Sequence, residues 1–260
     1  MKDVFDINFS EYISSYIHPS KEIEEHGKKL LEFTDFMKTL LVSFFFSGLI
    51  INVNAGSLLK DTVELKEFFV DSLNVGRKKY NKIELSRCQT SDSGWIIIKF
   101  YSKSNEKRWI LKQTFRFEKD DIRGCDMKLL DFNNDGLKDM TYISNTAARG
   151  ANEVRRLFIY EKSKDKLVYM KNSEDYPNML YNKKLNCIDA FLVYGGCSTV
   201  FLRIKGDSLV EFAAVEADND LRVYETDNKG NRKLLSEKKD TKLHYIRFIN
   251  YKPLTPSADY

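Results

Sequence analysis

Short runs of alternating hydrophobic and polar residues fill the chain from residue 82 onward, and polar turns separate them. Turn residues recur about every 8–12 positions, which is typical of strands joined by hairpins. We expect strands at 82–88, 94–101, 107–117, 126–131, 139–144, 155–161, 166–170, 185–193, 198–204, 208–215, 221–226, 231–236 and 242–250. Because strands do not alternate with helices, the pattern excludes a doubly wound parallel sheet. It predicts a mainly β, antiparallel domain of sandwich or propeller-like architecture over residues 80–260.

One segment before these strands has a different pattern. In residues 61–73, Leu65, Phe68, Phe69 and Leu73 recur at helical spacing. This predicts a short N-terminal helix within a helical lead-in at residues 56–79. The absence of a clean internal repeat counts against a propeller with identical blades.

A run of 13 mostly apolar residues, 39–51, follows the short basic start Met37-Lys38 and precedes a Val-x-Ala ending at Ala55. This order is typical of a secretory signal peptide, here residues 37–55, cleaved after Ala55. Since such signals stand at the amino terminus, we expect Met37 to be the real or an alternative start and residues 1–36 to be an upstream extension. The run is too short for a stable membrane span. The alternative is a buried core helix of a cytosolic protein.

Composition and charge narrow the class of protein. The chain has 260 residues, of which 42% are hydrophobic and 13% aromatic, enough for a substantial core. Lys and Arg number 42 against 38 Asp and Glu, for a net charge of +4. This balance does not indicate a nucleic-acid partner. We expect a globular periplasmic product.

All four cysteines, Cys88, Cys125, Cys187 and Cys197, follow the predicted cleavage point. An even number at wide spacing favours disulfides in an oxidising compartment. No two cysteines have the CxxC spacing that is typical of zinc sites, so the sequence does not indicate a zinc site. Four cysteines permit three pairings, and we favour Cys187 with Cys197 and Cys88 with Cys125. The alternative is four buried free thiols in a cytosolic protein.

The sequence DFNNDGLKD at residues 131–139 carries candidate metal chemistry. Oxygen-bearing side chains stand at its positions 1, 3, 5 and 9, and a glycine at position 6 permits a sharp turn. We expect Ca²⁺, bound by the side chains of Asp131, Asn133, Asp135 and Asp139 and the backbone carbonyl of Leu137. The alternative is an ordinary hairpin turn without metal, because Asn, Asp and Gly tolerate positive φ.

Two further loops are candidates for partner binding. Residues 145–152 form a long loop of small residues that includes Arg149 and Asn152, and Tyr194 precedes two glycines at a hairpin tip. Loops presented by a rigid scaffold are frequent recognition sites, so we expect Arg149, Asn152 and Tyr194 to contact a partner. The alternative is that both loops are plain connections.

Catalytic signatures are missing from the sequence. His244 is the one histidine after the predicted cleavage point, and GxSxG, HExxH and Gly-rich phosphate motifs are absent. The carboxylate pair Glu216 and Asp218 is better explained as surface charge in turns than as acid–base machinery. We therefore expect no enzymatic activity.

The order of these elements, centred on residues 129–139 and continued by the 150–152 loop, 158–161 and the hairpin from Cys187 to Cys197, resembles a known family over roughly residues 80–235. It is similar to the calcium-loop β-rich periplasmic immunity proteins that neutralise toxins of bacterial secretion systems. The resemblance implies Ca²⁺ at residues 131–139 and, as partner, a secreted cell-wall hydrolase or other periplasm-acting effector. A surface adhesin or carbohydrate-binding module with a structural calcium loop is the alternative function.

Overall fold

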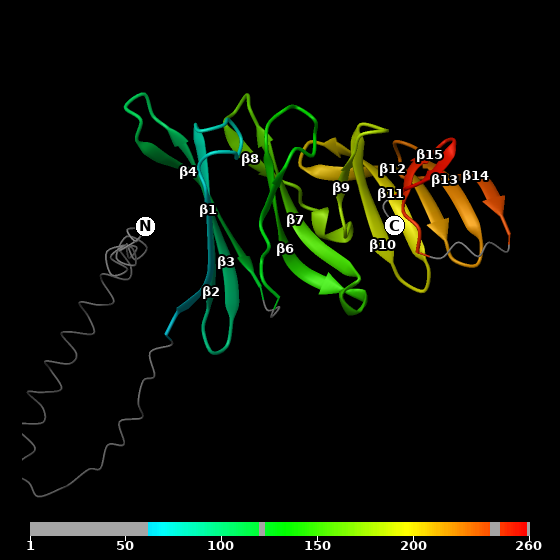
Figure 1. Ribbon diagram of the computed structural model, residues 1–260, viewed down its shortest axis with the longest axis horizontal. Helices are drawn as coiled ribbons and strands as arrows, with labels where there is room; N and C mark the ends of the chain where they lie inside the picture. The colour runs from blue at the N-terminus through cyan, green and yellow to red at the C-terminus, as the bar shows by residue number, and fades with distance from the viewer. Residues whose placement is uncertain (1–61, 120–122, 240–244, 259–260) are drawn as a thin grey trace, which may run out of the picture. The chain divides into compact units, whose positions relative to one another are not determined.

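The computed structural model describes residues 62–119, 123–239 and 245–258. The predicted extension 1–36, the predicted signal peptide 37–55 and the first residues of the lead-in lie outside the described residues. The described residues belong to one compact unit of antiparallel strands, which confirms the mainly β prediction (Figure 1). Within the described part of the chain, no helix is long and apolar enough to cross a membrane.

The first sheet contains four strands in chain order, and each pairs antiparallel with the next. They are β1 (Glu64–Asp71), β2 (Asn81–Gln89), β3 (Gly94–Lys103) and β4 (Trp109–Glu118). Burial alternates residue by residue along β3: Ile96, Ile98 and Phe100 are fully buried, and the residues between them are half-buried. This period of two sends every second side chain to the same face of the sheet.

The predicted N-terminal helix is wrong, because residues 64–71 form strand β1. Leu65 and Phe69 suit a helix and a strand equally well, since positions i and i+4 share a face in both. Burial along β1 instead alternates between exposed and half-buried positions. The deciding factor is pairing with β2, where Phe69 lies opposite Leu85.

A second four-stranded meander follows. It consists of β5 (Lys128–Leu130), β6 (Asp139–Ala147), β7 (Asn152–Glu161) and β8 (Lys166–Tyr169), with a 3₁₀ turn η1 (Ala148–Gly150) between β6 and β7. Leu130 pairs with Asp139, so residues 131–138 leave and re-enter the sheet at one point. The candidate metal loop is therefore closed by the sheet itself.

The third sheet has six strands in the order β14-β13-β12-β11-β10-β9, and a two-stranded hairpin ends the described chain. The strands of this six-stranded sheet are β9 (Leu180–Asn182), β10 (Cys187–Val193), β11 (Cys197–Lys205), β12 (Ser208–Ala217), β13 (Leu221–Thr226) and β14 (Arg232–Lys238). A turn η2 (Ser173–Asp175) precedes it, and the hairpin is β15 (Phe248–Tyr251) with β16 (Leu254–Pro256). Every expected strand overlaps an observed one, while β1, β9 and β16 were not expected as strands.

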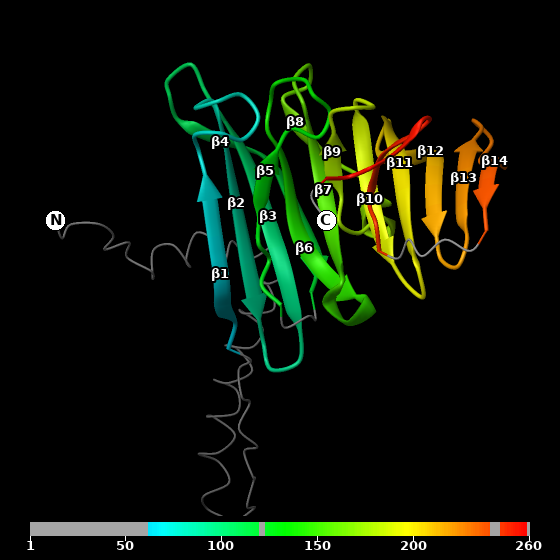
Figure 2. The ribbon, with the colours of Figure 1, turned by 45° about the vertical axis from the view of Figure 1, so that its right-hand side comes forward.

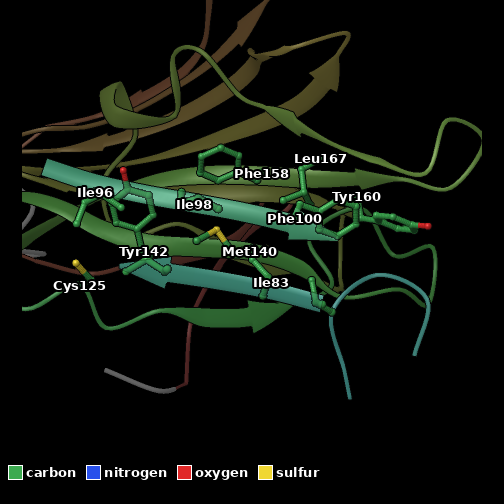
Figure 3. Packing of buried hydrophobic residues seen from close by; sticks show 12 residues of the cluster. Ile83, Ile96, Ile98, Phe100, Cys125, Met140, Tyr142, Phe158, Tyr160 and Leu167 are labelled. Atoms are coloured by element: carbon green, nitrogen blue, oxygen red, sulfur yellow. The ribbon is translucent and has the colours of Figure 1, made fainter. Parts of the chain in front are cut away.

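Hydrophobic clusters lie on the faces of these sheets. The first joins Ile83, Ile98 and Phe100 of the first sheet to Tyr142 and Phe158 of the second (Figure 3). The second cluster lies between the second and third sheets, and the third lies between the third sheet and β15. The sheets thus stack face to face, as the turned view also shows (Figure 2). Packing between sheets, and not a single central core, positions the connecting loops.

Candidate functional site

The candidate metal loop, residues 131–139, begins and ends on the second sheet. Asn134 and Gly136 have positive φ values of 58° and 81°, a conformation that Asn and Gly adopt more readily than other residues. The C-terminal end of the loop contacts the segment between β1 and β2, where Gly76 N donates a hydrogen bond to Lys138 O at 2.9 Å. The turn chemistry read from the sequence is therefore present.

The polar side chains of this loop accept hydrogen bonds from its own backbone. Asp131 Oδ1 accepts from Asp135 N at 3.2 Å, and Asp131 Oδ2 accepts from Gly136 N at 2.9 Å. Asp135 Oδ1 accepts from Leu137 N at 2.8 Å, and Asn133 Oδ1 accepts from Asp135 N at 3.3 Å. These bonds stabilise the turn.

Asp139 closes the loop from inside the protein. It is fully buried, and its two carboxylate oxygens accept from Phe132 N and Tyr160 N, both at 2.8 Å. Burial, together with the charges of Asp135 and Asp131, raises the pKa of Asp139 to about 7, against the lowering effect of these two bonds. A cation near Asp139 would relieve both the burial penalty and this repulsion.

The donor set matches Ca²⁺ in chemistry, since it consists of carboxylate, amide and carbonyl oxygens. In the described part of the chain, however, no three Asp, Glu, His or Cys side chains are gathered closely enough to hold a metal. Both carboxylate oxygens of Asp131, and Oδ1 of Asp135, already accept hydrogen bonds from backbone N–H groups. The side chains of Asp131, Asn133, Asp135 and Asp139 and the Leu137 carbonyl would be the ligands of a bound Ca²⁺.

The first candidate recognition loop is an exposed, tightly turned segment. Ala148, Arg149 and Gly150 have φ values of 50°, 55° and 93°, and all three are exposed. Positive φ at two consecutive non-glycine residues is uncommon and is held in place only by surrounding structure. Arg149 is consequently presented to solvent on a constrained backbone.

Asn152, which was predicted to contact a partner, is only 9% exposed, and its amide forms hydrogen bonds within the fold. Its Nδ2 donates to Val193 O at 2.9 Å, and its Oδ1 accepts from Val193 N at 2.9 Å. Its position at the start of β7 faces the end of β10. Asn152 therefore fastens the first candidate loop to the second.

Asn178, a residue not predicted from the sequence, strengthens this connection. Its Nδ2 donates to Ala151 O and to Phe191 O, both at 2.9 Å, and its Oδ1 accepts from Glu153 N at 3.0 Å. With a φ of 53°, Asn178 adopts the left-handed conformation that asparagine favours among non-glycine residues. An asparagine following Pro177 was the available signal for a specialised turn.

The second candidate loop presents Tyr194, which is 49% exposed. Its hydroxyl donates to Cys197 O at 3.2 Å, and its backbone N donates to Gly196 O at 2.9 Å. Gly196 packs against backbone, since a Cβ there would lie 2.6 Å from Ala217 O. The tip is held rigidly, with the tyrosine ring half outside.

Charged residues surround Tyr194. Partial burial raises the pKa of Tyr194, as do the nearby charges of Glu216 and Asp218. Those carboxylates are paired with arginines: Glu216 with Arg232 at 2.7 Å, and Asp218 with Arg222. The sequence predicted surface charge in turns for both; Asp218 follows β12, whereas Glu216 is half-buried within β12, and each is paired with an arginine.

The predicted disulfides are wrong in this structure, because Cys88, Cys125, Cys187 and Cys197 are all free thiols. Cys197 lies opposite Val193 beside the hairpin turn, whereas Cys187 lies at the other end of β10. About six residues along a strand correspond to roughly 20 Å, and a disulfide requires Cα atoms within about 7 Å. Cys125, Cys187 and Cys197 are buried, and Cys88 is half-buried.

Two of these thiols, Cys125 and Cys187, have raised pKa values and are therefore poor nucleophiles. Burial raises the pKa of Cys125 to about 12, and the charge of Glu67 adds to the effect. Burial likewise raises the pKa of Cys187 to about 12, helped by Asp189. Since the thiolate is the reactive form, neither residue has the character of a nucleophile.

Comparison with known proteins assigns this chain to no family. No protein-family model and no curated protein matches this chain. A solved structure described as a Xanthomonas type IV secretion system related protein is similar to it, with a TM-score of 0.42 and 12% sequence identity. The match covers 68% of this chain and 97% of that chain. A likeness of this degree assigns neither a family nor a function to this chain.

Proposed function

We propose that this chain is a non-enzymatic binding protein that works outside the cytosol as an immunity or inhibitor protein, neutralising a secreted antibacterial effector. The observation that carries the proposal is the pair of hydrogen bonds between the Asn152 amide and the backbone of Val193, each 2.9 Å long. They join two exposed loops into one surface. We call this surface, residues 147–151 together with 194–195, the paired loops.

The paired loops suit protein recognition for a thermodynamic reason. Binding by a loop that is already ordered loses less conformational entropy than binding by a mobile one. Here Asn152 and Asn178 fix the first loop, and the close approach of Gly196 to Ala217 fixes the second. The exposed side chains on them include Arg149 and Tyr194, two residue types that are enriched at interface hot spots.

In the proposed mechanism the paired loops block the active site of the effector, a cell-wall hydrolase or another periplasm-acting toxin. Tyr194 supplies a rigid aromatic anchor with a polar tip, and Arg149 supplies a cation for the carboxylates that such hydrolases use in catalysis. Neutralisation then needs no chemistry from this chain. It needs a surface that excludes substrate.

Calcium has a structural part in the proposal. Asp131, Asn133, Asp135, Asp139 and the Leu137 carbonyl would hold Ca²⁺ and fix the β5–β6 turn. The buried Asp139, whose pKa is raised by its surroundings, is the supporting observation. The ion would bind the folded state alone and so stabilise it.

Location is part of the same proposal and has its own test. If residues 37–55 direct export, the native product recovered from the periplasm begins at Gly56. Amino-terminal sequencing of that product decides the point. Recovery of the chain from the cell interior with its amino terminus intact would contradict the proposed site of action.

Function is tested by rescue of growth. Bacteria that export a cell-wall-degrading effector of a secretion system are made to express this chain, and survival is measured. We expect rescue by the wild-type chain and loss of rescue by the double variant Arg149→Glu/Tyr194→Ala. The matched control is Lys184→Glu/Tyr245→Ala, which reverses one exposed charge and removes a tyrosine that is 52% exposed. Equal survival with both double variants would show that the paired loops are not the binding surface.

A further inference from the structure

The two outermost sheets differ in what covers their far faces. The far face of the β9–β14 sheet packs against the C-terminal hairpin, where Phe201 and Tyr251 have ring centroids 5.6 Å apart. On the first sheet, the face directed away from β6 and β7 has no described strand against it (Figures 1 and 2). We call this surface, formed by the outward-pointing side chains of β1–β4, the outer face.

Large apolar side chains occupy the outer face. Ile96 and Ile98 of β3 are fully buried on the inner face. Because successive side chains of a strand point to opposite faces, Trp95 and Ile97 point outward. At the two edges, Val70 of β1 is 55% exposed and Leu111 of β4 is 48% exposed. A solvent-facing sheet is normally polar, so apolar residues gathered on one face indicate an interaction surface.

Cations lie among the aromatic rings of the same face. Arg116 Cζ is 4.5 Å from the Trp95 ring centroid, and Lys103 Nζ is 4.9 Å from that of Trp109. Lys82 Nζ lies 5.6 Å from the Trp109 ring. The side chains of these cations thus lie along apolar rings while their charged ends remain at the surface.

Negative charge on the outer face is largely neutralised. Glu84 is 9% exposed; it accepts from Tyr101 OH at 2.7 Å and pairs with Lys82 Nζ at 2.7 Å. In strands β2–β4, cross-strand pairing places four cations, Lys82, Lys99, Lys103 and Arg116, and two carboxylates, Glu84 and Glu118, on this face. The outer face is therefore apolar and net positive, and it suits a negatively charged ligand that also offers apolar contact.

The residue types on the outer face favour a lipid surface over a second copy of this chain or another protein. A second copy of this chain is disfavoured because like charges would face each other across the contact. Lysine is depleted at protein–protein interfaces, yet three of the four cations here are lysines. Tryptophan and tyrosine beside lysine and arginine are instead the residues that meet lipid headgroups, with the rings at the interface and the cations on the phosphates.

We propose that the outer face of the β1–β4 sheet docks on an anionic phospholipid bilayer. Lys82, Lys103 and Arg116 contact the lipid phosphates, while Trp95 and Trp109 lie at the headgroup level. The contact is peripheral and depends on charge. It uses a different surface from the paired loops and does not depend on the effector-binding proposal.

The chain offers a direct probe of this contact, because Trp95 and Trp109 are its two tryptophans and both lie on the outer face. Full-length protein is titrated with phosphatidylcholine vesicles that contain about 30% phosphatidylglycerol, and with pure phosphatidylcholine vesicles, while tryptophan emission is followed. We expect a blue shift, and quenching by brominated lipid, with the anionic vesicles alone. About 0.5 M NaCl should abolish the shift in the wild-type protein, because salt at that concentration screens charges within a few ångströms.

Matched variants locate the contact. Lys103→Glu/Arg116→Glu changes the charge of the outer face and should weaken vesicle binding at least about tenfold, given roughly 1 kcal/mol per basic residue at an anionic surface. Lys205→Glu/Lys229→Glu makes the same change in net charge at exposed positions on β11 and in the β13–β14 turn, and should change binding less than about twofold.

Three outcomes would overturn the proposal. Equal loss of binding in both double variants would show a nonspecific charge effect. Cosedimentation with vesicles without any change in tryptophan emission would place the lipid contact elsewhere in the chain. A shift with poly-L-glutamate or oligothymidylate, and none with vesicles, would assign the outer face to an acidic polypeptide or to nucleic acid.

Discussion

Asn152 and Val193, 41 residues apart, exchange two hydrogen bonds: the Asn152 amide nitrogen donates to Val193 O, and its oxygen accepts from Val193 N, each at 2.9 Å. The side chain thus acts as one more peptide group beside the end of β10. It makes the 147–151 loop and the Tyr194 loop a single mechanical unit. Recognition by the paired loops depends on this connection.

Asn152→Ala should separate the two loops. It removes both bonds and leaves the backbone groups of Val193 without their partner, for which we expect a loss of about 2 kcal/mol in the free energy of unfolding. Urea denaturation measures the loss, and hydrogen exchange at the Val193 amide should accelerate. Asn228→Ala, in the exposed β13–β14 turn, should leave both unchanged. Unchanged exchange at Val193 in Asn152→Ala would refute the connection.

Gly196 should not tolerate a side chain. A Cβ there would meet Ala217 O at 2.6 Å and Asp218 Cα at 2.9 Å, and both are backbone atoms that cannot turn aside. Gly196→Ala should therefore lower the free energy of unfolding by about 1–3 kcal/mol. At Gly195 the same addition meets nothing within 4 Å, so Gly195→Ala is the matched control. Equal stability of the two variants would contradict the rigid hairpin tip.

Acid should lower the free energy of unfolding by protonating Asp165, which links Asn81 and Arg77 to Tyr160. Burial by itself would raise the pKa of Asp165, but hydrogen bonds outweigh it and lower the pKa to about 2; the donors are Ser102, Asn81, Tyr160 and Arg77. Because the folded-state pKa lies below the ordinary value of 3.8, the unfolded chain binds more protons between these two values. The stabilisation is complete above about pH 4 and is lost as the pH falls to about 2.

The variant Asp165→Asn lacks the titrating carboxylate, so this pH dependence of the free energy of unfolding should be present in the wild type and absent from the variant. At neutral pH the wild type should exceed the variant in free energy of unfolding by about 2 kcal/mol, and the difference should shrink between pH 4 and pH 2. Denaturant titrations at a series of pH values give the comparison. Asp92→Asn, in the exposed turn between β2 and β3, serves as control. A difference that stays constant from pH 4 to pH 2 would rule out a lowered pKa.

Calcium should raise the melting temperature. At a concentration about a hundredfold above its dissociation constant, a ligand of the folded state contributes about 3 kcal/mol, or roughly 5–10 °C for a domain of this size. Asp131→Ala and Asp135→Ala should abolish the difference between Ca²⁺ and a chelator. Asp227→Ala is the control, because Asp227 also accepts backbone bonds from Lys229 and Asn231 in a turn, outside the metal loop. A wild-type melting temperature unaffected by chelator would refute calcium binding.

The strands were predictable where hydrophobic periodicity and turn chemistry agree. In β3, Ile96, Ile98 and Phe100 alternate with outward residues, and the alternation is legible in the sequence. In β1, Leu65 and Phe69 fit a helix and a strand equally, and only the pairing with β2 decides. Long-range pairing is invisible to a local pattern.

The candidate site was predictable as loops, and the contacts between loops were not. The sequence pointed to the Asn152 and Tyr194 loops separately, but that the Asn152 amide meets Val193 depends on how β7 and β10 pack. The same limit explains the disulfide error. Cys187 and Cys197 flank one hairpin, yet the strand register separates them. Spacing along the chain does not determine spacing across a sheet.

Inhibition of a purified hydrolase tests most directly whether this chain neutralises a secreted effector. The form beginning at Gly56 is titrated into each member of a panel of cell-wall hydrolases delivered by bacterial secretion systems, and dye release from labelled peptidoglycan is followed. We predict near-equimolar inhibition of at least one hydrolase, weakened at least about tenfold by Arg149→Glu/Tyr194→Ala and retained by Lys184→Glu/Tyr245→Ala. No inhibition across the panel, or equal inhibition by both double variants, would contradict neutralisation through the paired loops.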